Sequence, residues 1–114
     1  MLVSVIIPVF KVSSFIERCA RSLFEQTLQD VEYIFVDDAS PDDSIDILKR
    51  CIECYPQRKE HVLILTHEQN KGLPAARNTG LAVATGEYVF HCDSDDYVEL
   101  AMLDLYSICK GRGY

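Results

Sequence analysis

The chain alternates short apolar runs with amphipathic segments, and this alternation constrains its fold more than any other feature. The apolar runs predict strands at Val3–Val9, Val31–Val36, Val62–Thr66 and Tyr88–Cys92, the first with the continuous Val and Ile content of a strand buried on both faces. Between them, apolar residues recur at helical spacing. Alternating strands and helices form right-handed βαβ units. The sequence therefore predicts one α/β domain over residues 1–114, with a Rossmann-like, mainly parallel sheet and helices on both faces.

Local signals give the expected bounds of the helices. Ser14 and Glu17 have the spacing of a capping box, which predicts a helix over about 14–26. Ser40 and Pro41 have the residue types of an N-cap and a first helical position, so we expect the second helix to begin there. Further helices are expected from Pro74 to about Ala84, closed by Gly86, and over Leu100–Cys109.

Charge and composition exclude several functions. A net charge of −7 argues against a general nucleic-acid or anionic-membrane surface. The longest apolar stretch, Leu2–Phe10, is about half the ~20 residues that a membrane span needs, so we expect no span. The five cysteines are an odd number with no recognisable secretory leader, which favours reduced thiols in a cytoplasmic protein. Cys51-x-x-Cys54 lies in a helical pattern without a second ligand pair, so we interpret it as structural.

Carboxylates follow two of the expected strands at the sheet edge where α/β proteins bind ligands. Asp38 follows the second strand, and Asp93, Asp95 and Asp96 follow the fourth. Clustered carboxylates repel one another and lose hydration, which a divalent cation such as Mn²⁺ or Mg²⁺ compensates. Asp93 and Asp95, two apart in an extended segment, point the same way and can share one metal, whereas Asp96 can instead cap a helix. The sequence therefore predicts a metal site, and a phosphate as the substrate group that most often accompanies such a metal.

Three other candidates each have a structural alternative. Pro8, Val9 and Phe10 either end a strand or line a base-binding slot. Asp38 either belongs to the cap of the next helix or accepts a hydrogen bond from a nucleobase imide or a ribose hydroxyl. Arg77, near the start of a helix, is either a solvated arginine or a ligand of a diphosphate. No Gly-x-Gly-x-x-Gly follows the first strand, so a nicotinamide or flavin dinucleotide is not expected.

Six segments together resemble the N-terminal, nucleotide-sugar-binding half of family 2 glycosyltransferases, which are inverting enzymes of the GT-A fold. They occur in family order and spacing and cover nearly all of the chain from residue 3 to about 104. The six segments are Ser4–Phe10, Ser22–Thr27, Glu32–Ser40, Asn70–Asn78, Gly86–Tyr88 and Asp93–Asp96.

The resemblance implies a role for each candidate residue. Pro8, Val9 and Phe10 correspond to the base-binding strand end, and Asp38 to the acid that contacts the nucleobase, usually uracil. Arg77 corresponds to the basic residue near the pyrophosphate. Asp93 and Asp95 correspond to the Asp-x-Asp pair, with Asp93 toward the ribose or metal and Asp95 the direct ligand of Mn²⁺ or Mg²⁺. The sequence departs from the family at Phe10 and Lys11, where many relatives carry Tyr followed by Asn.

The implied reaction is hexosyltransferase-type transfer, with inversion, from a UDP-sugar to a hydroxyl of a saccharide or lipid-linked acceptor. Such enzymes often build polysaccharides at the inner membrane face. The family's catalytic base lies in its second half, so we expect these 114 residues to bind donor and metal but to transfer little sugar.

Two alternatives stay open. A metal-dependent nucleotidyltransferase is disfavoured, because its glycine-rich basic loop is absent after the first strand. A non-catalytic unit that binds a partner, or forms a homodimer through an exposed sheet face, is the second alternative.

Overall fold

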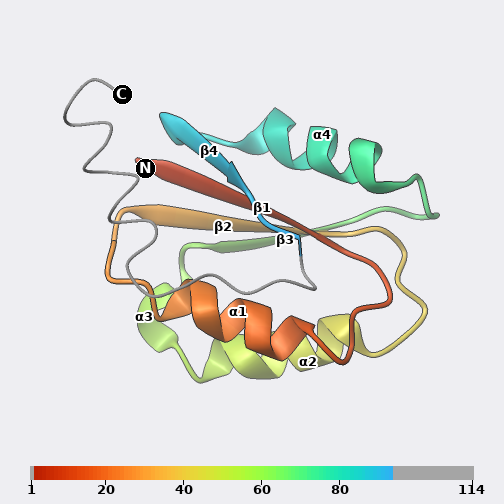
Figure 1. The fold of residues 1–114 in the computed structure, drawn as a ribbon, viewed down its shortest axis with the longest axis horizontal. Helices are drawn as coiled ribbons and strands as arrows, with labels where there is room; N and C mark the ends of the chain where they lie inside the picture. The colour runs from red at the N-terminus through yellow and green to blue at the C-terminus, as the bar shows by residue number, and fades with distance from the viewer. Residues whose placement is uncertain (1, 94–114) are drawn as a thin grey trace.

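A computed structural model describes residues 2–93, and it shows a central sheet between two layers of helices (Figure 1). The sheet has four parallel strands in the order β3-β2-β1-β4. The strands are β1 (Val3–Val9), β2 (Val31–Asp37), β3 (Val62–Thr66) and β4 (Tyr88–His91). The predicted parallel α/β sheet is therefore confirmed. Our expectations for Asp95, Asp96, Cys109 and the helix Leu100–Cys109 lie outside the described residues.

Helices cover both faces of the sheet, as predicted. One face carries α1 (Ile16–Phe24), α2 (Ser44–Glu53) and the short α3 (Pro56–Lys59), and the other carries α4 (Leu73–Val83) (Figure 1). Every residue of β1 is buried, because both of its faces are covered. A Cβ on Gly80 would lie 2.5 Å from the Ile6 side chain, so glycine at this position lets α4 pack closely on β1.

The predicted start of the first helix was wrong. Helix α1 begins at Ile16 with Phe15 at the N-cap, and no side chain caps it. Glu17 does not complete a capping box with Ser14; its carboxylate instead accepts a hydrogen bond from Arg21 Nε at 3.0 Å. Glu17 therefore takes part in an exposed ion pair along the helix and not in the expected cap.

The predicted start of the second helix was also wrong, since α2 begins at Ser44 rather than near Pro41. The reason is Asp42, whose Oδ1 accepts hydrogen bonds from the hydroxyls of Ser40 and Ser44, each at 2.5 Å. Its Oδ2 accepts the Ser13 N–H at 3.3 Å. These bonds keep the segment in a loop that ties the end of β2 to the loop after β1.

Gly86 does not close a helix as predicted, because α4 ends at Val83. Its N–H donates to Ser4 Oγ at 2.8 Å, and a Cβ at this position would lie 2.6 Å from the Ser4 backbone nitrogen. Glycine is therefore required by the close approach of the chain to β1. Within residues 2–93, none of the helices is long and apolar enough to cross a bilayer.

Candidate functional site

The carboxyl ends of β1 and β2 open on a cavity of about 480 Å³, a volume within the range of small-molecule sites. This is the edge at which ligands bind in open parallel sheets. The walls are mostly apolar, with two carboxylates and one amide among them. The lining residues are Pro8, Phe10, Val12, Asp38, Asn70, Gly72, Leu73, Ala76 and Asp93.

The cavity brings together most of the described residues that the sequence pointed to. Pro8, Phe10, Asp38 and Asp93 line it. The Val9 side chain is instead buried in the core, and its carbonyl accepts the Asp38 N–H at 2.9 Å. Arg77 is outside the lining, but its Nη2 lies 3.1 Å from Asp93 Oδ1, which connects it to the mouth of the cavity. Asp95 lies outside the described residues.

Asp38 is the more buried of the two carboxylates, with 3% of its surface exposed. Its Oδ1 accepts hydrogen bonds from His67 Nδ1 and from the Lys71 N–H, both at 2.8 Å. Its Oδ2 accepts the Gly72 N–H at 3.0 Å. Burial acts to raise the pKa of Asp38, but these donors outweigh it and hold the pKa below the ordinary value. The group is therefore an ionised carboxylate, and Oδ2 has one described donor, where a carboxylate oxygen can accept two.

Asp37, unlike Asp38, forms a hydrogen bond within the turn that follows β2. Its Oδ1 accepts the Ser40 N–H at 2.9 Å, which closes a turn directly after β2. Within that turn Ala39 has φ 58°, a left-handed conformation that is unfavourable for a residue with a Cβ. The turn therefore directs the Asp38 carboxylate to the cavity at a cost in backbone strain.

Lys11 also has a left-handed backbone, with φ 53°. Its N–H donates to Ser40 Oγ at 2.9 Å, so the loops after β1 and β2 are joined beside the cavity. Asparagine tolerates this conformation better than lysine. The left-handed backbone at Lys11 therefore has a cost that an asparagine at this position would lower.

His67 is a site residue that the sequence analysis missed. It follows β3 directly and is 8% exposed, with Nδ1 on Asp38 and Nε2 2.7 Å from Thr79 Oγ1 of α4. The register pairs Asp37 with Thr66, so the next residues of the two strands, Asp38 and His67, meet at the sheet edge. The pairing of Asp38 with His67 can be predicted only when the strand order is known.

Asp93 has the chemistry of a hard-cation ligand. Its side chain is 47% exposed, and after the contact with Arg77 it still offers carboxylate lone pairs to the cavity. Among residues 2–93 no cluster of three or more His, Cys, Asp or Glu side chains is arranged to hold a metal. Any metal bound at Asp93 therefore needs ligands from outside those residues or from a substrate.

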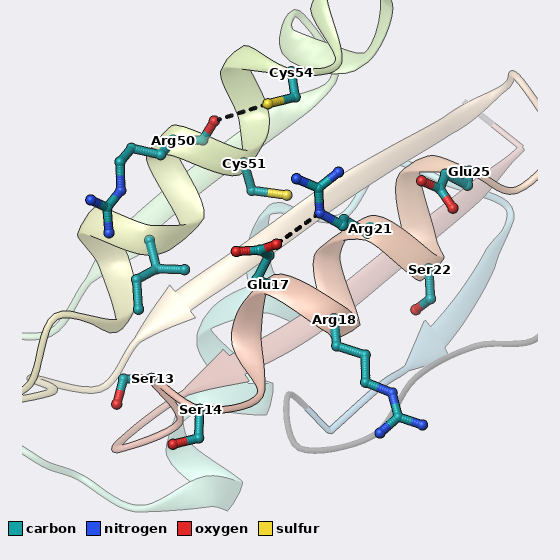
Figure 2. Close-up of a pocket in the computed structure, with 11 residues that line it drawn as sticks. Ser13, Ser14, Glu17, Arg18, Arg21, Ser22, Glu25, Arg50, Cys51 and Cys54 are labelled. Carbon is teal, nitrogen blue, oxygen red and sulfur yellow. Dashed lines mark hydrogen bonds and ion pairs between the residues drawn. The ribbon is translucent and has the colours of Figure 1, made fainter.

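A second hollow, of about 880 Å³, lies between α1 and α2 and shares no lining residue with the cavity (Figure 2). Figure 2 shows Glu17 directed at Arg21, and the Cys54 thiol directed at the Arg50 carbonyl. The thiol donates to this carbonyl, with 3.7 Å between sulfur and oxygen. Burial raises the pKa of Cys51 to about 11, which disfavours the thiolate form that reacts or binds a metal. These contacts support the structural interpretation of Cys51-x-x-Cys54.

Comparisons with known proteins show which family this chain is similar to. A family model described as "Glycosyl transferase family 2" matches residues 4–104. The uncharacterized glycosyltransferase EpsJ of Bacillus subtilis (strain 168) is 46% identical over 101 residues, which cover 89% of this chain and 28% of EpsJ. A poly(ribitol-phosphate) beta-glucosyltransferase of Bacillus spizizenii is 40% identical over 114 residues, covering 96% of this chain and 17% of that protein.

Solved structures are similar along the same region. S. aureus TarS 1–349 in complex with UDP-GlcNAc has a TM-score of 0.87 and 30% identity, covering 98% of this chain and 32% of TarS 1–349. The mannosyltransferase PcManGT from Pyrobaculum calidifontis, in complex with GDP-Man and Mn²⁺, has a TM-score of 0.78 and 31% identity, covering 83% of this chain and 28% of PcManGT. The chain thus spans less than a third of the length of these relatives.

Proposed function

The chain belongs to glycosyl transferase family 2, and from this premise we propose that its cavity binds the UDP-sugar of a hexosyltransferase-type reaction. The relatives support a nucleotide sugar as donor, because TarS was solved with UDP-GlcNAc and with UDP. The sugar is transferred to a hydroxyl of a saccharide or lipid-linked acceptor with inversion, as part of polysaccharide biosynthesis.

The observation that carries the proposal is the Asp38 carboxylate at the wall of the cavity, whose Oδ2 has one described donor, the Gly72 N–H. Uracil offers an N3–H donor at its Watson–Crick edge, whereas cytosine offers an acceptor at the same place. Phe10, which is 37% exposed, provides an aromatic face on which a base can stack. Guanine also has an N–H donor at this edge, but the uridine complexes of TarS favour uracil.

The diphosphate lies, in this proposal, at the Arg77 and Asp93 side of the cavity. The Arg77 guanidinium is partly exposed and provides positive charge for a diphosphate. Its Nε is buried and has no hydrogen-bond partner within the described part of the chain. A substrate with two negative phosphates suits a site beside a partly exposed guanidinium.

Asp93, together with Asp95, would hold Mn²⁺ or Mg²⁺, and the proposal rests on the carboxylate that Asp93 keeps available at the cavity. When bound, the metal stabilises the departing diphosphate as a Lewis acid. The chain's own residues hold and orient the donor: Asp38 fixes the base, and Arg77 opposes the charge of the phosphates. We propose no residue among 2–93 as the general base that activates the acceptor.

Calorimetric titration of the chain with UDP, UDP-GlcNAc and CDP, with and without Mn²⁺, tests the proposal. We expect UDP to bind more tightly than CDP and Mn²⁺ to strengthen UDP binding. Asp95→Ala should remove the effect of Mn²⁺, and Asp38→Asn should weaken UDP binding by about tenfold or more, the value of one charge-assisted hydrogen bond. Asp30→Asn is the matched control, since Asp30 precedes β2 at the opposite edge of the sheet. Absence of binding by any uridine nucleotide would refute the proposal and favour a non-catalytic unit.

A further inference from the structure

We propose that His67 is a positioning residue that sets the base selectivity of the donor site by fixing the orientation of the Asp38 carboxylate. The inference rests on the proposed function. It adds a residue that does not itself line the cavity, and it makes a prediction about selectivity that the donor site alone does not make.

The Asp38 carboxylate presents the same oxygen to the cavity only while its orientation is held by hydrogen bonds. Oδ1 has two donors, from His67 and Lys71, and Oδ2 has one, from Gly72. Within residues 2–93, the imidazole is the side-chain donor in this set and the other two are backbone amides of a loop. Without the imidazole, each oxygen would keep one backbone donor, and Oδ1 would have a vacant acceptor position open to water.

His67 is itself held on several sides. Its backbone N–H donates to the Asp37 carbonyl at 2.8 Å. This bond continues the hydrogen-bond ladder between β2 and β3 by one residue past the end of β3. Its Nε2 lies 2.7 Å from Thr79 Oγ1, and the Thr79 hydroxyl lies 3.0 Å from the Ala75 carbonyl on the same helix. The ring is therefore clamped between the end of the sheet and α4, and its Nδ1 has a fixed direction toward Asp38.

The consequence is a link between two sides of the donor site. Helix α4 carries Arg77, and Ala76 of the same helix lines the cavity. His67 connects this helix, through Thr79, to the carboxylate that reads the base. Loss of the contact between His67 and Asp38 should reduce the difference in affinity between uracil and cytosine nucleotides, because the two remaining backbone donors hold the carboxylate less firmly and water can bind Oδ1.

Two amide substitutions separate the two contacts of the ring. An asparagine places its side-chain nitrogen near the position of Nδ1, and a glutamine places its nitrogen near the position of Nε2. His67→Asn should therefore keep a donor on Asp38 and lose Thr79, whereas His67→Gln should keep Thr79 and lose Asp38. Arg77→Gln is the control for the phosphate side, because it should weaken UDP and CDP binding equally.

The experiment is a set of calorimetric titrations of the 114-residue chain and these variants with UDP and CDP, after urea unfolding has shown that each variant is folded. We expect His67→Gln to lower the ratio of UDP to CDP affinity by about tenfold. His67→Asn should stay within about threefold of the parent ratio, and Arg77→Gln should keep it. The inference would be overturned if His67→Gln kept the ratio of UDP to CDP affinity of the parent chain. It would also be overturned if His67→Gln and His67→Asn lowered this ratio equally. If the parent chain binds no uridine nucleotide, the proposed function fails and this inference fails with it.

Discussion

The buried guanidinium of Arg58 provides the sharpest test of how the fold is held together. Arg58 is 2% exposed and has no carboxylate partner among its described contacts. Its Nε donates to the Phe24 carbonyl at 3.0 Å and its Nη1 to the Leu28 carbonyl at 2.9 Å, while Nη2 donates to the Gln26 carbonyl. These carbonyls lie at the end of α1 and in the turn that leads to β2. One cation therefore satisfies a stretch of backbone that no helix or strand satisfies.

Arg58→Met keeps most of the apolar stem and removes the donors. The bonds to Phe24 and Gln26 are buried, and each unsatisfied carbonyl costs about 1–2 kcal/mol, whereas the Leu28 carbonyl is partly exposed and can bind water. We therefore expect a loss of about 2–4 kcal/mol in the free energy of unfolding, a large part of the ~5–15 kcal/mol of a typical domain. Part of the loss is offset because a buried cation no longer has to be dehydrated.

Urea unfolding followed by circular dichroism measures this loss, with an unchanged m-value as the sign that the unfolding reaction is the same. The matched control is Lys59→Met on the same short helix. Lys59 Nζ pairs with Glu53 at 2.7 Å, but both side chains are more than half exposed, so the control should cost less than about 1 kcal/mol. A loss below 1 kcal/mol for Arg58→Met, or equal losses in the two variants, would refute the reasoning.

Two further predictions concern the carboxyl edge of the sheet. Ala39→Gly should raise the free energy of unfolding by about 0.5–1 kcal/mol, because relief of the left-handed strain at φ 58° outweighs the added freedom of the unfolded chain; urea unfolding measures this, and Ala39→Val should have the opposite sign. The lowered pKa of Asp38 should give stability that is complete above the unfolded-state pKa of about 4 and is lost as the pH falls through the folded-state value. The difference in urea midpoint between the parent and Asp38→Asn should therefore be constant above about pH 5 and shrink on acidification, and a difference that grows on acidification would contradict the assignment.

The strands could be predicted from the sequence because their signal is local. The continuous apolar content of Val3–Val9 gave the observed bounds of β1, and Val31–Val36 missed only the last residue of β2. Parallel pairing then followed from the alternation with helices. The helix starts failed because Ser14 and Ser40 have the residue types of caps, whereas the structure uses Ser40 to bind Asp42 and the Lys11 N–H in the neighbouring loop. A serine that caps a helix and a serine that hydrogen-bonds to a neighbouring loop can occur in the same local sequence.

The residues that sequence reasoning missed act over long separations in the chain. His67 contacts Asp38, 29 positions earlier, and Arg58 contacts carbonyls 30 or more positions earlier. Each contact depends on the strand order and on the direction of a loop. A local sequence pattern predicts neither of these. Asp38 itself was found because its position directly after a buried strand is a local signal. The candidate site was therefore predictable as a set of strand ends, but its supporting contacts were not.

The two edges of the sheet are held by different means, and this separates stability from ligand binding. At the amino edge, Arg58 satisfies backbone carbonyls before β2 and has no described contact with the cavity. At the carboxyl edge, side chains of one loop bind the backbone of another: Ser40 accepts the Lys11 N–H, and Asp38 accepts the amides that follow Asn70. Loops tied in this way are already in the shape that contacts the ligand, so binding loses less conformational entropy in ordering them. Changes at Arg58 should therefore lower stability without altering the affinity of the folded chain for UDP, whereas changes at Asp38 should alter both.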